Sequence, residues 1–368
     1  MSMSEKVNPF TPTFGKVPLL FAGRKHVIND IVHGLEGDLG DPNRTSLFVG
    51  ARGSGKTALM TQISREAEQR GWVSANVTAL PGMLEDVYER TKAASAEFIS
   101  ADTHSRITGL NAAGVGITGE LIKEPRGNWR SRMTTLLDEL NTQSVGLLIT
   151  VDEVDITLDE LRELVATFQH FVREDREVAL LLAGLPQNVS ALLHDKTISF
   201  LRRAMQHRLG AIHEMHEVRE TIKRTIELSG RSIDEAALEK VTDATGGYPF
   251  LIQLVGYHVW RQSPKAHEIS LEDADEGIRY AVSDMNARIF DVILRELSDT
   301  DQKFLEAMLA DEDESKMVDI ADRMGVSASY AAQYRRRLLE QGVIGTRGHG
   351  KVGFDMPQFR DYLESGLY

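Results

Sequence analysis

Short apolar runs alternate with helix-like segments between residues 45 and 186. The apolar runs are continuous, which suits strands buried on both faces of a parallel sheet. They lie at 46–49, 72–77, 145–151 and 178–183. Apolar residues recur at helical spacing in the segments between and after them. These segments are 56–70, 83–97, 128–143 and 157–174. The alternation predicts an α/β domain whose parallel sheet carries helices on both faces.

After residue 212 the pattern is almost wholly helical. A first group of helices is predicted at 216–228, 233–245, 249–262 and 271–297. A second group is predicted at 299–310, 317–324 and 328–341. Two short strands around glycines follow between 343 and 354 and indicate a β-wing. We therefore expect three domains, which are the α/β domain 1–212 with an N-terminal segment 1–44, an all-helical lid 213–297 and a winged helix-turn-helix domain 298–368.

Two stretches fall outside this pattern. Residues 100–123 are rich in Gly and Thr, which predicts an inserted hairpin or mobile loop without assignable chemistry. The acidic run 311–314 is typical of a solvated loop between two helices.

Composition narrows the class of protein. The 368 residues include 42 Lys and Arg against 55 Asp and Glu, which gives a net charge of −13, and 42% of them are hydrophobic. This composition excludes a disordered or fibrous chain. The absence of cysteine excludes disulfide scaffolds, thiolate zinc sites and cysteine nucleophiles. No signal-like or membrane-spanning run occurs, so we expect a cytoplasmic protein that does not contact the membrane. Any nucleic-acid site on so acidic a chain must be local.

The strongest motif lies between the first strand and the first helix. Gly50-Ala-Arg-Gly-Ser-Gly-Lys-Thr57 matches the pattern G-x-x-x-x-G-K-[ST] at every fixed position. Its backbone N–H groups and the helix N-terminus can surround a polyphosphate. Lys56 is expected to reach the β- and γ-phosphates, and the Thr57 hydroxyl to bind Mg²⁺. The sequence thus predicts a P-loop NTPase that binds ATP with Mg²⁺. Its nucleotide contacts would come from Gly50, Ala51, Arg52, Gly53, Ser54, Gly55, Lys56 and Thr57.

The third strand ends in two acids that complement this loop. In Leu147-Leu-Ile-Thr-Val-Asp-Glu153, Asp152 is placed to hold Mg²⁺ through water, and Glu153 to orient and deprotonate an attacking water. The pair predicts ATP hydrolysis to ADP and phosphate. The alternative is an acidic strand end that caps the next helix.

These motifs, their spacing and the helical layer after them resemble the AAA+ and STAND branch of P-loop ATPases over about residues 20–261. Pro18-Leu-Leu-Phe-Ala-Gly-Arg24 resembles the box of this class that lines the adenine pocket, which implies that Gly23 and Arg24 contact the nucleotide. Gly246-Gly-Tyr-Pro-Phe250 resembles its Gly-x-Pro motif, which implies that Tyr248 and Pro249 lie near the base. The alternative for this segment is a C-cap glycine followed by a proline at the first position of a helix.

The chain departs from this class in two places. Replication-initiation members carry a lid arginine that touches the γ-phosphate, and the 246–250 segment offers none. The fourth strand ends without a polar residue at the sensor position, where Gln187 or Asn188 could serve, so we expect slow turnover. Arg202 and Arg203 stand where the class places an arginine finger that acts on a neighbour's nucleotide, which implies a homo-oligomer. Ion pairing with surface acids is the alternative for this pair.

Residues 298–368 resemble a winged helix-turn-helix domain. Ile320-Ala-Asp-Arg-Met-Gly325 gives a helix and a turn glycine, and Ser327 can cap the next helix. Residues 326–352, here called the basic segment, hold five Lys or Arg against one Glu. The resemblance implies that the second helix enters a DNA major groove and that the wing reaches phosphates. The expected contacts to double-stranded DNA are Ser329, Gln333, Arg335, Arg336, Arg337, Arg347 and Lys351. Winged helices in STAND ATPases also serve as packing or signalling modules, and this alternative stays open.

Two hypotheses of function follow. The first is an ATPase similar to the origin-recognition and archaeal ATPase families, in which the nucleotide state controls DNA binding. The second is a STAND-like signalling or scaffold protein that oligomerises with ATP and whose winged helix contacts protein. A small-molecule kinase is disfavoured, because the chain's extra length forms a helical layer and a winged helix instead of an acceptor pocket.

Overall fold

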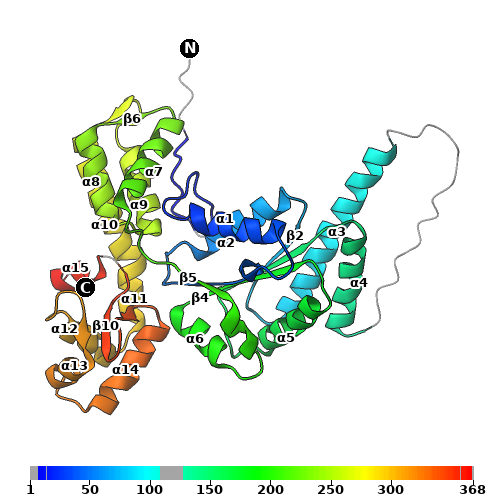
Figure 1. Cartoon of the computed structure of the whole chain (residues 1–368). Helices are drawn as coiled ribbons and strands as arrows, with labels where there is room; N and C mark the ends of the chain where they lie inside the picture. The colour runs from blue at the N-terminus through cyan, green and yellow to red at the C-terminus, as the bar shows by residue number, and fades with distance from the viewer. Residues whose placement is uncertain (1–6, 14, 108–126, 357, 367–368) are drawn as a thin grey trace.

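The α/β part of the chain is built on a five-stranded parallel sheet (Figure 1). The structure, a computed structural model, describes residues 7–13, 15–107, 127–356 and 358–366. The strands are β1 (Thr45–Val49), β2 (Val73–Thr78), β3 (Leu147–Asp152), β4 (Val178–Gly184) and β5 (Met205–Arg208), in the order β2-β3-β4-β1-β5. All neighbours are parallel, so every strand ends at the same edge of the sheet.

Helices cover both faces of this sheet. Along β1, Phe48 packs toward one face, and Leu47 and Val49 pack toward the other, as the two-residue period of a strand requires. The first face is covered by α1 (Lys25–Glu36) and α2 (Lys56–Glu68). The core of the second face includes α3 (Met83–Ile107), α4 (Trp129–Thr142), α5 (Asp159–Arg173) and α6 (Pro186–His194). The predicted α/β class is therefore confirmed.

The sequence pattern missed three of these elements and misplaced a fourth. It gave no signal for α1, α6 or β5. Strand β5 reads Met-Gln-His-Arg and pairs with a single neighbour, so it has no apolar run to detect. Helix α3 continues to Ile107, so the predicted loop is wrong for 100–107, where neither Gly nor Pro interrupts the helix. Its remainder, 108–123, lies outside the described residues.

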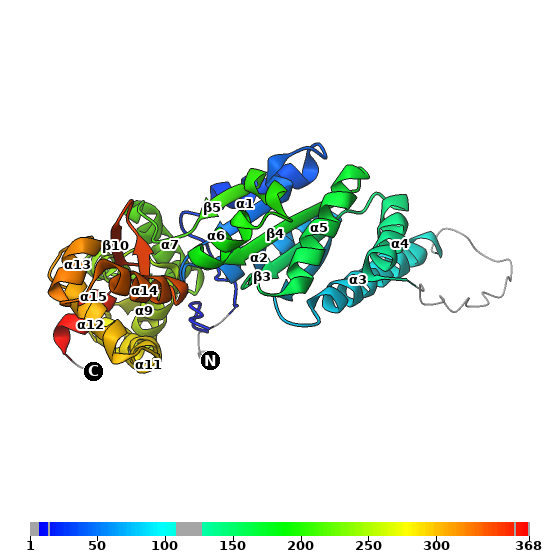
Figure 2. The ribbon, with the colours of Figure 1, turned by 90° about the horizontal axis from the view of Figure 1, so that it is seen from below.

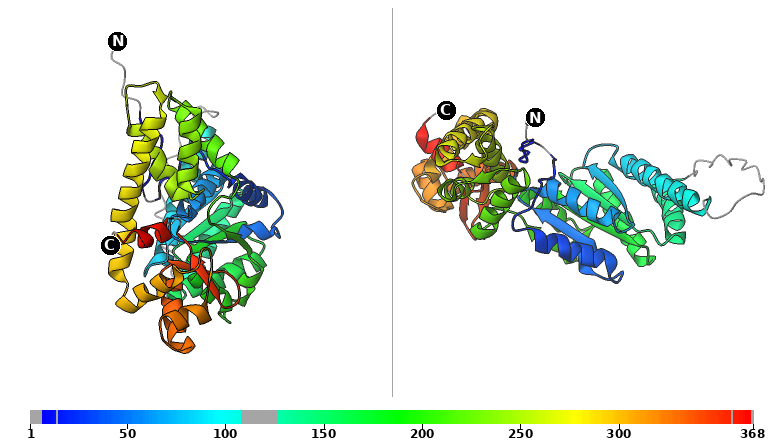
Figure 3. Two further views of the ribbon diagram at one scale, coloured as in Figure 1. Left: turned by 90° about the vertical axis from the view of Figure 1, so that its left-hand side faces the viewer. Right: turned by 90° about the horizontal axis from the view of Figure 1, so that it is seen from above.

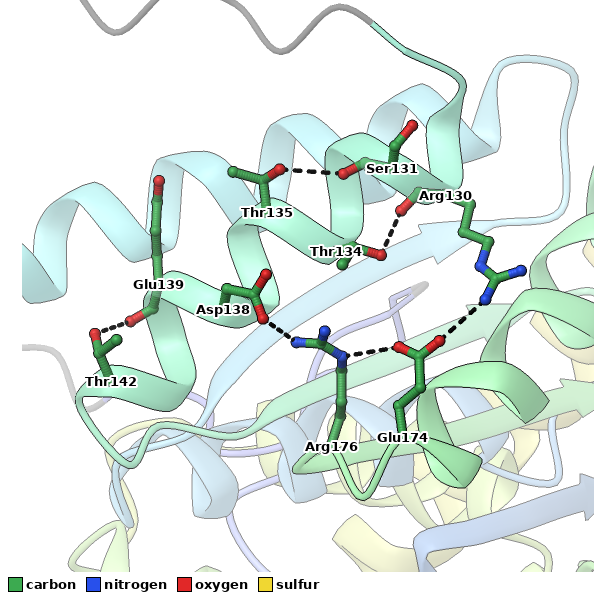
Figure 4. A network of polar contacts seen from close by, with 9 residues as sticks. All are labelled: Arg130, Ser131, Thr134, Thr135, Asp138, Glu139, Thr142, Glu174 and Arg176. Carbon is green, nitrogen blue, oxygen red and sulfur yellow. Dashed lines mark hydrogen bonds and ion pairs between the residues drawn. The ribbon is translucent and has the colours of Figure 1, made fainter.

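An ion-pair network joins helix α4 to the turn between α5 and β4 (Figure 4). Arg176, between α5 and β4, binds Asp138 of α4 at 2.6 Å and Glu174 at 3.1 Å, and Glu174 binds Arg130 at 3.0 Å. Figure 2 shows α3 and α4 at the opposite end of the molecule from the last helices of the chain.

A layer of helices follows the sheet. It contains α7 (Met215–Leu228), α8 (Glu235–Thr245), α9 (Pro249–Arg261), α10 (Leu271–Met285) and the paired β6 (Ser232–Ile233) and β7 (Glu268–Ile269). Helices α9 and α10 approach closely at Gly277, where a Cβ would lie 2.5 Å from the Val259 Cα. The helix predicted at 271–297 is interrupted, because α10 passes through a π-helical turn, η3 (Asn286–Phe290), into α11 (Asp291–Glu296). Figure 3 shows this long helix leading into the last module.

The C-terminal module has the elements predicted for a winged helix. Its helices are α12 (Asp299–Met308), α13 (Met317–Arg323), α14 (Ala328–Glu340) and α15 (Phe359–Ser365). Its antiparallel sheet has the order β8 (Ser315–Lys316), β10 (Lys351–Phe354), β9 (Ile344–Thr346). Ser327 caps α14 by accepting a hydrogen bond from the Tyr330 N–H at 3.3 Å, as predicted. The module shares one hydrophobic core with the helical layer, where Phe290 meets Phe359 at a ring distance of 4.9 Å.

The module also contacts the α/β domain. Helix α14 packs against α6. At Gly342, just after α14, a Cβ would lie 3.3 Å from a methyl group of Leu185, which precedes α6. In the described parts of the chain, no helix combines the length and the apolar character that crossing a membrane requires.

Candidate functional site

Residues 50–57, here called the phosphate loop, join β1 to α2 at the carboxyl edge of the sheet. Gly53 and Gly55 have φ angles of +79° and +89°, which L side chains rarely adopt. Gly55 is the N-cap of α2, and no side chain caps this helix. The first-turn N–H groups of α2 therefore remain available to an anion.

Lys56 lies inside the loop. Its side chain is buried, and Nζ donates hydrogen bonds to the carbonyls of Gly50 at 2.9 Å and Ala51 at 3.0 Å. Burial lowers the pKa of the Lys56 ammonium, and the carboxylates of Glu153 and Asp152 oppose that shift. The Ser54 hydroxyl, also buried, has no hydrogen-bond partner. The loop thus contains a buried ammonium group whose hydrogen-bond partners are backbone carbonyls, and a buried hydroxyl that has no partner.

The end of β3 meets the start of α2. The Thr57 hydroxyl donates a hydrogen bond to the Asp152 carboxylate, whose other oxygen accepts the Glu153 N–H at 2.9 Å. Glu153 has a left-handed backbone, with φ of 53°. Such backbone strain in a non-glycine residue concentrates at functional sites. The Val154 N–H holds this turn by donating to the Ala183 carbonyl of β4 at 2.9 Å.

A cavity of about 480 Å³ opens above the phosphate loop. Its walls come from the loop, residues 11–13 and 15–22, α7, α9 and the α10–α11 helix. Five cations and one carboxylate line it. They are Lys16, Arg24, Arg52, Lys56 and Arg288, with Glu153. In a chain of net charge −13, this concentration of positive charge fits a polyanionic ligand.

One wall is the N-terminal strap, which we define as residues 7–13 and 15–22. Phe10 anchors it, because a Cβ at Gly256 of α9 would lie 2.4 Å from the Phe10 ring. The Asn8 side chain donates to the Tyr257 carbonyl at 3.0 Å. At Gly15, a Cβ would lie 3.8 Å from the Thr57 methyl group. The strap therefore runs along α9 and reaches the phosphate loop.

Gly23 and Arg24 follow the strap. The Gly23 N–H donates to the Glu217 carboxylate at 3.0 Å, and a Cβ at Gly23 would lie 2.6 Å from Ile212. Arg24 lines the cavity and donates to the Gly210 carbonyl at 2.5 Å. Burial lowers the pKa of the Arg24 guanidinium, and Glu214 opposes this shift. Gly23 thus positions the chain, and Arg24 faces the cavity.

The 246–250 segment packs directly on the phosphate loop. The Tyr248 hydroxyl donates to the Arg52 carbonyl, and the Phe250 N–H donates to the Gly53 carbonyl at 3.2 Å. Gly246 ends α8 with φ of 53°, and Pro249 begins α9, so the cap geometry is also present. Burial raises the pKa of the Tyr248 phenol, and the Asp355 carboxylate adds to the shift. The segment ties the helical layer to the loop.

The chain does not bring the predicted arginine pair to this cavity. Arg202 and Arg203 are exposed on a 3₁₀-helix, η2 (Ser199–Arg203), and Arg202 Nε donates to the Leu193 carbonyl at 2.8 Å. Gln187 and Asn188 lie on α6 and do not line the cavity either. Within one chain, these residues are separate from the phosphate loop.

The residues around Thr57 fit a magnesium ion bound together with phosphates. Over the described ranges, no group of three His, Cys, Asp or Glu residues could hold a metal alone. Mg²⁺ commonly takes one or two protein oxygens and completes its shell with phosphates and water. The Thr57 hydroxyl and the Asp152 carboxylate, which are hydrogen-bonded to each other, match that donor set.

The sequence reasoning missed several residues that line the cavity. Thr11, Gln253, Arg288 and Met356 all belong to its wall. They come from the strap, α9, the π-helical turn η3 and the end of the wing. No local motif marks them, because each reaches the cavity only through tertiary packing.

The predicted DNA contacts lie on α14 and the wing. Ser329, Gln333, Arg336, Arg337 and Arg347 are exposed, and Arg335 and Lys351 are half-buried. Four of the basic residues form ion pairs with acids of this chain, and three of the four acids lie outside the basic segment. The pairs are Arg336–Glu340 at 3.8 Å, Arg337–Asp301 at 2.9 Å, Arg347–Asp355 at 2.8 Å and Lys351–Glu314. The local charge counted from the sequence is therefore largely compensated.

Comparisons place this architecture among known structures. Residues 287–363 match a family described as a domain of unknown function, DUF8462. No curated protein matches the chain. The ORC2 protein of Aeropyrum pernix, solved as ADPNP-ADP complexes, is 13% identical over 96% of each chain, with a TM-score of 0.57. Cdc6p of Pyrobaculum aerophilum is 14% identical over 97% of this chain and 98% of its own, with a TM-score of 0.48. The RuvB Holliday junction branch migration motor of Thermotoga maritima is 17% identical over 94% and 95%, with a TM-score of 0.45.

The chain has the fold of the Aeropyrum pernix ORC2 protein. This likeness covers nearly the whole of both chains and includes the sheet, the helical layer and the C-terminal module. The fold implied by the resemblance to archaeal and origin-recognition ATPases is therefore confirmed.

Proposed function

We propose that this chain is an ATPase that binds ATP with Mg²⁺ in the cavity and hydrolyses it slowly, and that its nucleotide state controls DNA binding by the C-terminal module. The observation that carries the proposal is the cavity itself. Five cations and one carboxylate surround a complete phosphate loop in an acidic chain. The ORC2 protein that shares this fold was solved with ADPNP and ADP.

The chain's own residues have distinct roles in this reaction. Backbone N–H groups of the phosphate loop and of the first turn of α2 bind the phosphates. Lys56 exchanges the carbonyls of Gly50 and Ala51 for phosphate oxygens. Thr57 and Asp152 hold Mg²⁺, which neutralises charge on the phosphates when bound. Glu153 accepts a proton from the attacking water.

Slow turnover follows from what surrounds the phosphates. Phe250 occupies the segment where related ATPases carry a lid arginine, and it binds the loop through its backbone N–H. The helical layer contributes Arg288 to the cavity wall instead, and this side chain is held 3.3 Å from Asp284. Arg202 or Arg203 can complete a site only in a neighbouring copy, so full activity requires oligomerisation.

Two contacts couple the cavity to the DNA-binding module. Met356, just after β10, lines the cavity. The neighbouring Asp355 forms an ion pair with Arg347 of the wing and acts electrostatically on Tyr248 at the phosphate loop. A nucleotide that moves the loop therefore changes the surroundings of the wing.

A STAND-like scaffold is the second candidate, and the C-terminal module favours it. Its cations are compensated by carboxylates, and the end of α14 packs on α6 instead of facing solvent. In that case the module contacts protein, and ATP drives oligomerisation. The mass in solution with and without ATP tests the second candidate. A persistent monomer contradicts the scaffold and also a finger supplied by another copy, but it does not contradict nucleotide control of DNA binding.

The decisive experiment is fluorescence anisotropy of a labelled DNA duplex titrated with the full chain at two salt concentrations, with and without ATP and Mg²⁺. We expect binding that depends on ATP and weakens steeply with salt. The K56A variant is the control, and its affinity for ATP should fall by about 100-fold, because two or more charged hydrogen bonds to phosphate are lost. Its DNA binding should no longer respond to ATP. Equal duplex affinity with and without ATP would overturn nucleotide control, and unchanged ATP affinity of K56A would overturn the phosphate-loop assignment.

A further inference from the structure

The end of β4 places no polar side chain in the site. Its last residues are Ala183 and Gly184, and both are buried. Their carbonyls nevertheless join the two halves of the site. The Ala183 carbonyl accepts the Val154 N–H at 2.9 Å, and the Gly184 carbonyl accepts the Gly50 N–H at 3.3 Å. The end of β4 is therefore hydrogen-bonded both to the turn that carries Glu153 and to the start of the phosphate loop.

Gly184 also packs directly against the residue that follows Glu153. A Cβ at Gly184 would lie 2.6 Å from Val154 Cγ2 and 3.4 Å from Val189 Cγ2 of α6. Carbon atoms that are not bonded to each other pack best at about 3.5 to 4.0 Å. The φ angle of Gly184 does not lie in the left-handed region, so the backbone there does not require glycine. The close approach of Val154 is therefore what excludes a side chain at this position.

Val154 cannot yield to an added side chain without moving the turn. Its side chain is fully buried and β-branched, so it has no long, flexible end that could swing aside. Glu153 before it has a left-handed backbone, and strain of this kind persists only where the surrounding structure holds it. The contact between Val154 and Gly184 is part of that surrounding structure. A displacement of Val154 would therefore move Glu153.

We propose that Gly184 is a positioning residue for ATP hydrolysis: because it has no side chain, Val154 packs against the end of β4, and this contact fixes where the Glu153 carboxylate meets the attacking water. This inference rests on the proposed function, because it concerns the hydrolysis step at the same site. A misplacement of about 1 Å at a reacting group lowers a rate by up to about 100-fold. Packing behind the turn thus orients Glu153 in a chain whose β4 ends without a polar side chain.

The test is a double-mutant cycle on the full chain. G184A adds a methyl group that meets Val154, and V154A removes the Cγ2 methyl group that it would meet. The G184A/V154A variant therefore restores the space. The matched control is G146A, because a Cβ at Gly146 would also lie 2.6 Å from a side chain, the ring of Trp72. Gly146 comes just before β3, so the same substitution causes similar crowding at the opposite edge of the same sheet.

Phosphate release measures kcat, calorimetry measures the affinity for ATP, and thermal unfolding shows whether each variant is folded. We expect G184A to lower kcat by about 30-fold and V154A by about tenfold, with ATP affinity within about twofold of native in both. The double variant should return to within about threefold of the native kcat, because the effects of two residues in contact are not additive. G146A should unfold at a lower temperature and keep the native kcat and ATP affinity.

Different outcomes separate the inference from the function on which it rests. If the native chain binds no ATP or releases no phosphate from it, the proposed function fails and the inference fails with it. If the native chain hydrolyses ATP and G184A does so at the native rate, only the inference fails. It also fails if G184A/V154A is no faster than V154A, a comparison that stays valid if G184A alone does not fold.

Two further results would overturn the inference. An equal loss of kcat in G146A would mean that crowding anywhere in the sheet slows hydrolysis. A loss of ATP affinity in G184A as large as its loss of kcat would mean that the added methyl group distorts the phosphate loop instead of displacing Glu153.

Discussion

Most of the cations around the phosphate loop have no carboxylate partner among the described residues, whereas most of those in the basic segment have one. At the cavity, Lys56 and Arg24 donate to backbone carbonyls, and among the described residues Lys16 and Arg52 form no ion pair. The fifth cation, Arg288, contacts Asp284 at 3.3 Å. In the basic segment, four of the five Lys and Arg residues have a carboxylate of the same chain as partner.

This difference shows that a count of basic residues does not measure charge available to a ligand. A cation that donates only to carbonyls keeps its net charge. In a partly buried cavity, solvent screens the attraction between that charge and a nearby phosphate less than it does at the surface. A cation paired with a carboxylate offers a ligand only what remains after that pair is weakened or exchanged. The cations around the phosphate loop are therefore available to a polyanion, whereas a DNA phosphate would have to compete with the module's own acids.

The first way to sharpen the comparison is to neutralise the carboxylate that lines the cationic cavity. We expect E153Q to lower kcat for ATP hydrolysis by about 10²- to 10⁴-fold, because the amide cannot accept the water's proton. ATP affinity should be kept or increased, since the cavity becomes more positive. Phosphate release and ATP titration measure the two effects. D155N is the matched control, because Asp155 accepts hydrogen bonds from Thr157 and does not line the cavity. Normal turnover in E153Q would mean that another residue positions the water.

The sequence was informative where a feature is local. The strand and helix periods predicted four of the five sheet strands, and the loop motif predicted a turn between a strand and a helix that places Lys56 and Thr57 at the start of α2. The edge strand β5 escaped detection because a strand of Met, Gln, His and Arg carries no apolar signal. The strap wall and Arg288 escaped because their place depends on packing between distant segments.

In the basic segment, too, the sequence could not reveal an arrangement that depends on packing. The five cations of this segment were read from a window of consecutive residues. Three of them are compensated by acids from other elements. Asp301 lies on α12, Glu314 lies just before β8, and Asp355 follows β10. Charge patterning along the chain could not reveal these pairs, because ion pairs form across space.

A second prediction concerns an ion pair that stabilises the folded C-terminal module. Arg323 donates to both oxygens of Asp311, at 2.6 and 2.8 Å, and chiefly this contact lowers the pKa of Asp311 to about 2. A lowered carboxyl pKa stabilises the folded state above the ordinary value of 3.8, and that stability disappears as the pH falls through about 2. After allowance for solvent screening, we expect D311N to lower the free energy of unfolding by about 1 kcal/mol at neutral pH.

Urea unfolding at several pH values checks this effect. The difference between D311N and the native chain should shrink as the pH falls below about 4, where the carboxyl of the unfolded chain takes up its proton, and should disappear near pH 2, where the folded one does. D313N is the control, because Asp313 belongs to the same acidic run and makes no ion pair in the described parts of the chain. Equal destabilisation by both variants, or a difference independent of pH, would contradict a specific role of the Asp311–Arg323 pair.

The smallest expected effect tests the comparison at the wing itself. Glu314 is half exposed and pairs with Lys351, so E314Q should free this cation for a DNA phosphate. We expect duplex affinity to rise about threefold at low salt and the salt dependence to steepen by about one phosphate contact. Anisotropy titrations over a range of salt measure both quantities. E306Q is the matched control, since Glu306 is exposed on α12 and releases no wing cation while changing the net charge equally. If E306Q strengthens binding as much as E314Q, the effect comes from the change in overall charge. The ion pair with Glu314 then does not limit binding of a DNA phosphate by Lys351.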